Sequence, residues 1–172
     1  HKLVTLLDGV RTETLYTPCC GKPISINYEG KITRFEYFSN GTLKKKTSPA
    51  GEMVELSYDK IFGKVEKVVR SDPKLKSADI TTYAYDKKGN LAYAQNQAKK
   101  IHVQLIYDTK GRIKTLIDQS GKKIAFNYNE LGKPTKITLG GVGSINVSYN
   151  AGGKITNVNS TGGRKIAAEV TA

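Results

Sequence analysis

The chain has 172 residues, 38% of them hydrophobic, and a net charge of +13 from 28 basic and 15 acidic side chains. Its apolar stretches are only a few residues long, so we expect no membrane-spanning helix. The basic residues are spread along the whole chain, which leaves two interpretations open: attraction to polyanions such as acidic polysaccharide, or lysines that protect exposed sheet edges.

A tyrosine recurs along the chain at intervals of 21, 21, 27, 22, 21 and 21 residues. The seven positions are Tyr16, Tyr37, Tyr58, Tyr85, Tyr107, Tyr128 and Tyr149. A glycine follows each of them four or five residues later, at Gly21, Gly41, Gly63, Gly89, Gly111, Gly132 and Gly153. A fixed period of this size is typical of repeat proteins, so we predict a single array of about seven units over residues 1–172.

Each unit reads as an alternating strand that ends in the tyrosine, a short polar turn that ends in the glycine, and a second strand. Asp or Asn follows the tyrosine in five units, and such side chains accept hydrogen bonds from N–H groups two residues on. The glycine supplies the positive φ of the turn. A second turn edge is expected at Gly9, Gly30, Gly51, Gly121 and Gly163. With no 3.6-residue periodicity, the sequence predicts an all-β protein: a repetitive antiparallel β-hairpin meander of about fourteen strands.

The first tyrosine turn carries two adjacent cysteines, Cys19 and Cys20, next to Lys22. Adjacent cysteines cannot close an ordinary loop-forming disulfide, and no further cysteine or histidine completes a zinc site. An intermolecular crosslink and an exposed turn without a role both stay open. We expect no metal and no cofactor.

The long interval between Tyr58 and Tyr85 places an insertion at residues 71–79, whose proline and charges are typical of an enlarged surface loop. A tolerated insertion explains it more simply than a contact loop.

The sequence offers few candidates for catalytic residues, because the only histidines are His1 and His102. His102 lies in an alternating strand, where a histidine on the polar face is usually solvated. Residues 140–143 are glycine-rich, but no helix pattern follows them to form a phosphate site. We therefore predict no catalytic residues and no enzymatic activity.

Tyrosines on every second strand are expected to form a ladder at intervals of roughly 9.6 Å, with each ring packed over the neighbouring hairpin. Beside the turn glycines stand five basic residues, Lys22, Lys64, Arg112, Lys133 and Lys154. This stripe predicts a contact for acidic polysaccharide or another polyanion. It lacks the elements of a sequence-specific nucleic-acid reader.

The segments Tyr85-Asp86-Lys87-Lys88-Gly89-Asn90-Leu91 and Tyr107-Asp108-Thr109-Lys110-Gly111-Arg112-Ile113 resemble the YD repeat of the Rhs family and of teneurins. The resemblance covers essentially the whole chain. It implies a long YD-repeat β-strip, curled or spiralling, of the kind that forms a hollow shell around a toxin or part of a cell-surface adhesion protein. It also implies a bacterial protein located outside the cell or at its surface.

The two ends of the chain fall at equivalent phases of the repeat. His1-Lys2-Leu3 matches Gly111-Arg112-Ile113, and the expected last strand, residues 164–172, ends near the place of the next tyrosine. The first and last strands of the chain therefore have the phases of two neighbouring strands in the repeat. We expect head-to-tail self-association, in which the last strand of one chain pairs with the first strand of the next. The sequence thus predicts an extracellular structural protein that assembles into a fibre or surface layer. The alternatives are a polyanion- or carbohydrate-binding adhesion module and a fragment of an Rhs-type toxin-encapsulating shell.

Overall fold

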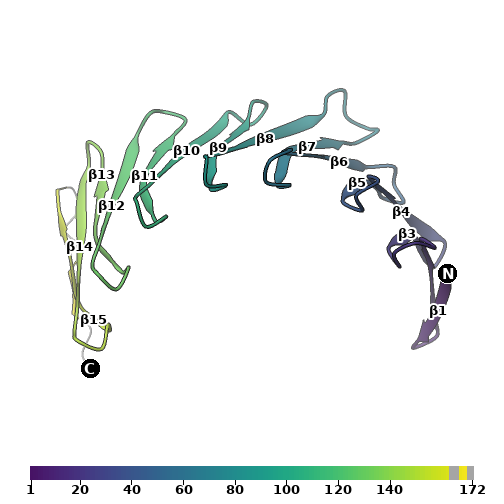
Figure 1. The fold of residues 1–172 in the computed structure, drawn as a ribbon, viewed down its shortest axis with the longest axis horizontal. Coiled ribbons are helices and arrows are strands. Elements are labelled where there is room, and N and C mark those ends of the chain that lie inside the picture. Colours follow the sequence, from purple (N-terminus) through teal and green to yellow (C-terminus); the bar gives the residue numbers. More distant parts are fainter. Residues whose placement is uncertain (163–166, 170–172) are drawn as a thin grey trace. The chain divides into compact units, whose positions relative to one another are not determined.

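The computed structural model describes residues 1–162 and 167–169, so Gly163 and most of the expected last strand lie outside the described residues. All regular structure in the described part is antiparallel β-strand, which confirms the predicted fold class. The chain divides into two compact units, His1–Tyr83 and Ala84–Ala172. Figure 1 shows most strands joined by short turns, with a longer connection between β7 and β8.

The first unit contains strands β1 (Lys2–Leu7), β2 (Val10–Tyr16), β3 (Pro23–Tyr28), β4 (Lys31–Tyr37), β5 (Leu43–Thr47), β6 (Met53–Tyr58) and β7 (Val65–Ser71). The boundary between the units falls within β8 (Asp79–Tyr85). The second unit continues with β9 (Leu91–Asn96), β10 (Ile101–Tyr107), β11 (Ile113–Asp118), β12 (Lys123–Tyr128), β13 (Pro134–Leu139), β14 (Gly143–Tyr149), β15 (Ile155–Thr161) and β16 (Ala167–Glu169). The described residues thus form sixteen strands rather than about fourteen, because β1 and β16 flank the seven tyrosine hairpins.

A β-bulge recurs where a strand reaches its repeat tyrosine. In the pairing of β10 with β11, Ile106 lies opposite Thr115, but Tyr107 lies opposite Ile113, so Lys114 is the extra residue. The same register shift stands before Tyr16, Tyr37, Tyr58, Tyr128 and Tyr149. A bulge increases the local twist and re-aims the side chain beside it. The repeat therefore sets the direction of the tyrosine as well as its position.

The tyrosine turns have the predicted chemistry. After Tyr107, the Asp108 N–H donates to the Arg112 carbonyl at 2.8 Å, and the N–H groups of Lys110 and Arg112 both donate to Asp108 Oδ1 at 2.9 Å. Gly111 has φ +79°, a conformation that side chains with a Cβ rarely adopt. The Asp and Gly of the motif thus close the turn locally, as the sequence indicated.

Each unit is a single-layer sheet with almost no buried core. Val68, 6% exposed, is the buried hydrophobic residue of the described part. In the second unit, alternation puts cross-strand apolar pairs such as Phe126–Ile137 on the tyrosine face and polar pairs such as Lys136–Asn146 on the opposite face. Contacts between neighbouring strands therefore hold each unit together, as in other repeat proteins.

Candidate functional site

The repeat tyrosines bind the hairpins of the sheet to one another through backbone carbonyls. The hydroxyl of Tyr128 donates to the carbonyl of Ile113 at 2.7 Å, across 15 residues. Four further tyrosines repeat the contact at 2.8 Å with separations of 14 to 16 residues: Tyr37 to Pro23, Tyr58 to Leu43, Tyr107 to Leu91 and Tyr149 to Pro134. In each case the acceptor is the first residue of the strand that follows the preceding tyrosine turn. We call this contact, with the side chain that covers the ring, the tyrosine clasp.

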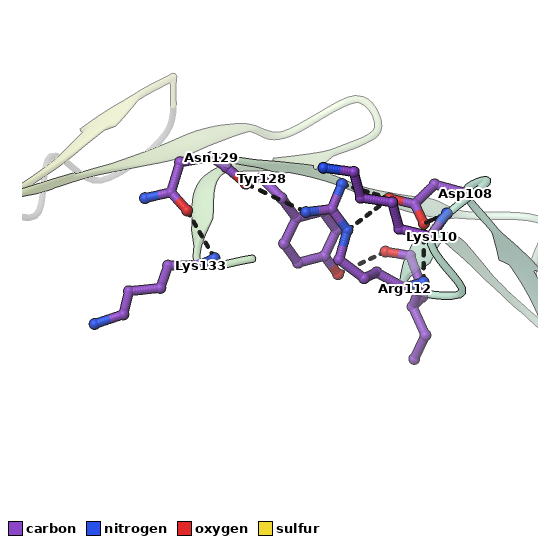
Figure 2. Close-up of polar contacts among 7 residues, drawn as sticks. Asp108, Lys110, Arg112, Tyr128, Asn129 and Lys133 are labelled. Carbon is purple, nitrogen blue, oxygen red and sulfur yellow. Dashed lines mark hydrogen bonds and ion pairs between the residues drawn. The ribbon is translucent and has the colours of Figure 1, made fainter. Parts of the chain in front are cut away.

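The clasp of Tyr128 has the largest set of described contacts, because Arg112 covers its ring. Figure 2 shows the Arg112 guanidinium lying against the Tyr128 ring. The distance from Arg112 Cζ to the ring centroid is 4.5 Å. Asp108 Oδ2 holds the guanidinium at 2.7 Å from both Nε and Nη2, and Nη1 donates to the Asn129 carbonyl at 3.2 Å. A cation over a tyrosine face is attracted by the ring quadrupole. One arginine thus joins its own turn, the next tyrosine and the turn beyond it.

Two lysines make the same clasp in other turns. Lys22 Nζ lies 5.5 Å from the Tyr37 ring centroid and donates to the Gly41 carbonyl. Lys133 Nζ lies 5.5 Å from the Tyr149 ring centroid and donates to the Gly153 carbonyl. In both cases the residue before the acceptor of the tyrosine hydroxyl provides the cation.

Where the turn lacks a basic residue at this position, other contacts take its place. Thr42 precedes the acceptor Leu43, and Phe38 meets the Tyr58 ring edge-on at 6.1 Å between centroids. Asn90 precedes the acceptor Leu91, and its amide donates to Asp86 at 3.0 Å. The hydroxyl-to-carbonyl bond is therefore the constant part of the clasp.

Two of the clasped tyrosines have raised pKa values. Burial raises the pKa of Tyr37, and the charge of the nearby Cys20 adds to the shift. Burial also raises the pKa of Tyr107, with a further contribution from the Asp86 carboxylate. Both phenols thus stay protonated, and able to donate a hydrogen bond, to a higher pH than an ordinary tyrosine.

Two of the turn aspartates, Asp86 and Asp108, have lowered pKa values. Backbone and side-chain hydrogen bonds from Arg112, together with its charge, lower the pKa of Asp108. A side-chain hydrogen bond from Asn90 is the main cause of the lowered pKa of Asp86. Each carboxylate therefore accepts turn hydrogen bonds throughout the neutral range.

The structure places the five predicted polyanion contacts beside the turns. Three of them, Lys22, Arg112 and Lys133, lie over tyrosine rings, which the sequence did not indicate. Lys154 is exposed. The expected binding of polyanions by these residues stays a prediction.

Cys19 and Cys20 both have exposed, free thiols, and their Sγ atoms are 2.8 Å apart. Thr17 Oγ1 lies 3.2 Å from Cys20 Sγ. The hydrogen bond with Cys19 is the largest cause of the lowered pKa of Cys20, followed by that with Thr17 and the charge of Lys22. The predicted crosslink through these thiols stays a prediction.

His102 lies on β10, where its ring meets Tyr93 of β9 at 4.7 Å between centroids. Across the part of the chain that the structure describes, no three His, Cys, Asp or Glu side chains are grouped to hold a metal ion. Nor do the described residues include a helix that could cross a membrane.

The inserted segment connects β7 to β8 through residues 72–78. A hollow of about 360 Å³ beside it is lined by Glu52, Met53, Val54, Arg70, Ser71, Asp72, Leu75, Ser77 and Asp79. The lining mixes both signs of charge with apolar groups, which indicates no particular ligand class.

The sequence did not reveal the acceptors of the tyrosine hydroxyls, because a backbone carbonyl leaves no residue-type signature. A signal was present in the spacing of five repeats: the residue two positions after the turn glycine stands 14 to 16 residues before the clasped tyrosine. A constant separation of that kind indicates a constant contact.

A family model described as the teneurin YD-shell matches residues 61–165. A comparison with curated proteins gives no match. Among solved structures, the chain is similar to the crystal structure of TcdB2-TccC3-Cdc42, with a TM-score of 0.67 and 11% identity over 87% of this chain and 8% of that one.

Two further structures share the fold. A Photorhabdus luminescens Tc holotoxin pore with a mutation in TccC3 has a TM-score of 0.57 and 9% identity over 93% of this chain and 11% of that one. TcdB2-TccC3 without its hypervariable C-terminal region has a TM-score of 0.52 and 16% identity over 92% of this chain and 10% of that one. The chain therefore spans about a tenth of the length of these structures.

Proposed function

Because the chain belongs to the teneurin YD-shell family, we propose that it is one stretch of the wall of a YD-repeat shell. Its role in this proposal is structural: it extends a sheet that encloses other protein. Among the interpretations of the sequence, the family match favours the shell segment over the fibre or surface layer.

The tyrosine clasp is the observation that carries this proposal. A single-layer sheet with one buried hydrophobic residue in its described part cannot rely on a core. A hydroxyl-to-carbonyl bond in successive repeats fixes each hairpin to the next at the same edge. A unit of this kind can be added many times without a change of design, as the wall of a large shell requires.

We propose no catalytic role for this stretch. The ring of His102 packs against the ring of Tyr93. The clasp residues bond to one another and to backbone carbonyls, which suits a scaffold. A location outside the cell or at its surface stays a prediction.

Electron microscopy of the natural polypeptide that carries these repeats tests the proposal. We expect hollow closed particles, and a protease added from outside should leave enclosed segments intact until the particles are opened by denaturant. Filaments of head-to-tail strips would overturn the shell proposal and support the fibre. Single open strips with no enclosed segment would overturn both.

Polyanion binding is a second candidate, because the net charge of +13 attracts acidic glycans. Retention on a sulfated polysaccharide column should fall with rising salt if such contacts form. Lys154→Gln removes an exposed basic side chain outside the observed clasps and should lower the retention. Retention that does not depend on salt would exclude this function.

A further inference from the structure

The first tyrosine turn brings two thiols together that an extended strand would separate. In a strand, successive side chains point to opposite faces, whereas the turn places Cys19 Sγ and Cys20 Sγ 2.8 Å apart. A disulfide bond is about 2.05 Å long, so the two sulfurs would have to approach by roughly 0.8 Å. Both side chains are exposed to reagents in solution.

The thiol pair is connected to the first tyrosine clasp through Thr17. Thr17 Oγ1 lies 3.2 Å from Cys20 Sγ and also accepts the Lys22 N–H at 3.1 Å. The side chain of Lys22 in turn covers the Tyr37 ring and donates to the Gly41 carbonyl. A movement of Cys20 away from Thr17 therefore acts on the residue that forms the clasp.

We propose that Cys19 and Cys20 form a redox modification site, in which a low-molecular-weight disulfide such as glutathione disulfide converts them to a vicinal disulfide within one chain. The new bond draws Cys20 away from Thr17 and loosens the clasp of Lys22 on Tyr37. Both the formation of the disulfide and the loosening of the clasp are independent of the proposed shell function.

The reaction is a double thiol–disulfide exchange. The Cys20 thiolate attacks one sulfur of glutathione disulfide, forms a mixed disulfide and releases one glutathione. The Cys19 thiolate then attacks the Cys20 sulfur and releases the second glutathione. Two electrons pass from the cysteine pair to the reagent, and the two thiol protons leave with the two glutathione molecules.

Cys20 is suited to the first attack, since its pKa is lowered by hydrogen bonds with Cys19 and Thr17 and by the charge of Lys22. The disulfide that forms is strained, because adjacent Cα atoms are about 3.8 Å apart and disulfides prefer at least 4.4 Å. Strained disulfides are reduced readily, so excess glutathione should restore both thiols.

Mass spectrometry after treatment of the dilute chain with glutathione disulfide tests the modification. We expect a monomer two hydrogens lighter, with both thiols lost and both regained on reduction. Cys19→Ser, which retains Cys20, should instead stop at a stable glutathione adduct. A wild-type product that is only the adduct, or a covalent dimer, would overturn the proposal; the dimer would support the intermolecular crosslink.

Hydrogen exchange tests the link to the clasp, with a turn that lacks cysteines as its internal control. The Lys22 amide donates to Thr17 Oγ1, and the equivalent Lys133 amide donates to Asn129 Oδ1 at 2.9 Å. Oxidation should speed exchange at Lys22 several-fold and leave Lys133 unchanged. Equal rates at Lys22 before and after oxidation would show that the hydrogen bond between Lys22 and Thr17, which links the thiols to the clasp, does not respond.

Discussion

The hydroxyl of Tyr149 donates a hydrogen bond to the carbonyl of Pro134 at 2.8 Å, across 15 residues. Most repeats have an aliphatic residue at the acceptor position, whereas Pro23 and Pro134 are exceptions in the sequence. Proline lacks the N–H donor but keeps its carbonyl, and it is tolerated as the first residue of a strand. Both exceptions therefore preserve the part of the residue that the clasp uses.

Tyr149→Phe should lower the free energy of unfolding by about 0.5–1.5 kcal/mol, the usual net value of one hydrogen bond. The ring and its packing stay, so the change isolates the hydroxyl and leaves the Pro134 carbonyl without its donor. Urea unfolding followed by circular dichroism measures it. Tyr28→Phe is the matched control, since Tyr28 is 49% exposed and takes no part in a clasp. Equal effects at the two positions would contradict the clasp.

The contact between Arg112 and Tyr128 is expected to have a coupling energy of about 0.5–1 kcal/mol. A double-mutant cycle with Arg112→Gln and Tyr128→Leu measures this coupling, because effects that do not depend on the contact cancel. Lys114→Gln paired with Tyr128→Leu is the control, since Lys114 is an exposed basic residue on β11, two positions after Arg112. A coupling near zero for Arg112 would mean that its position over the ring contributes nothing.

The elements that the sequence predicted correctly are those that depend on residue type. Asp108 and Gly111 mark a turn because only a few side chains close such a turn or accept its positive φ. The clasp depends instead on a carbonyl, which every residue has, so composition could not reveal it. Arg112 lies over Tyr128 beside a β-bulge, and no residue type marks that bulge.

Gly111 and Gly143 should respond differently to alanine. At Gly111 a Cβ would meet no atom. Gly111→Ala should therefore lower the free energy of unfolding only through the strain of a side chain at φ +79°, by about 1–2 kcal/mol. At Gly143 a Cβ would collide with the Thr161 carbonyl oxygen, which belongs to the backbone of the neighbouring strand. Gly143→Ala should therefore lower the thermal midpoint further than Gly111→Ala. The reverse order would show that β15 can move away from β14 at little cost.

Alkaline titration should reveal the environment of Tyr107. Burial and the Asp86 carboxylate raise its pKa in the folded chain, so its contribution to stability is complete below about pH 10, the unfolded value, and is lost as the pH rises through the folded value. Tyr107→Phe should thus remove phenolate absorbance that develops above about pH 10.

Asp86→Asn separates the charge of Asp86 from the burial of Tyr107. Asn occupies the equivalent position at Asn129 and Asn150, where it accepts the same turn hydrogen bond, so the turn should be retained. The loss of the negative charge should shift ionisation of Tyr107 to lower pH, because a nearby carboxylate disfavours the phenolate. Asp59→Asn, in the turn after Tyr58, should leave that titration unchanged. An unchanged profile in Asp86→Asn would assign the whole shift of Tyr107 to burial.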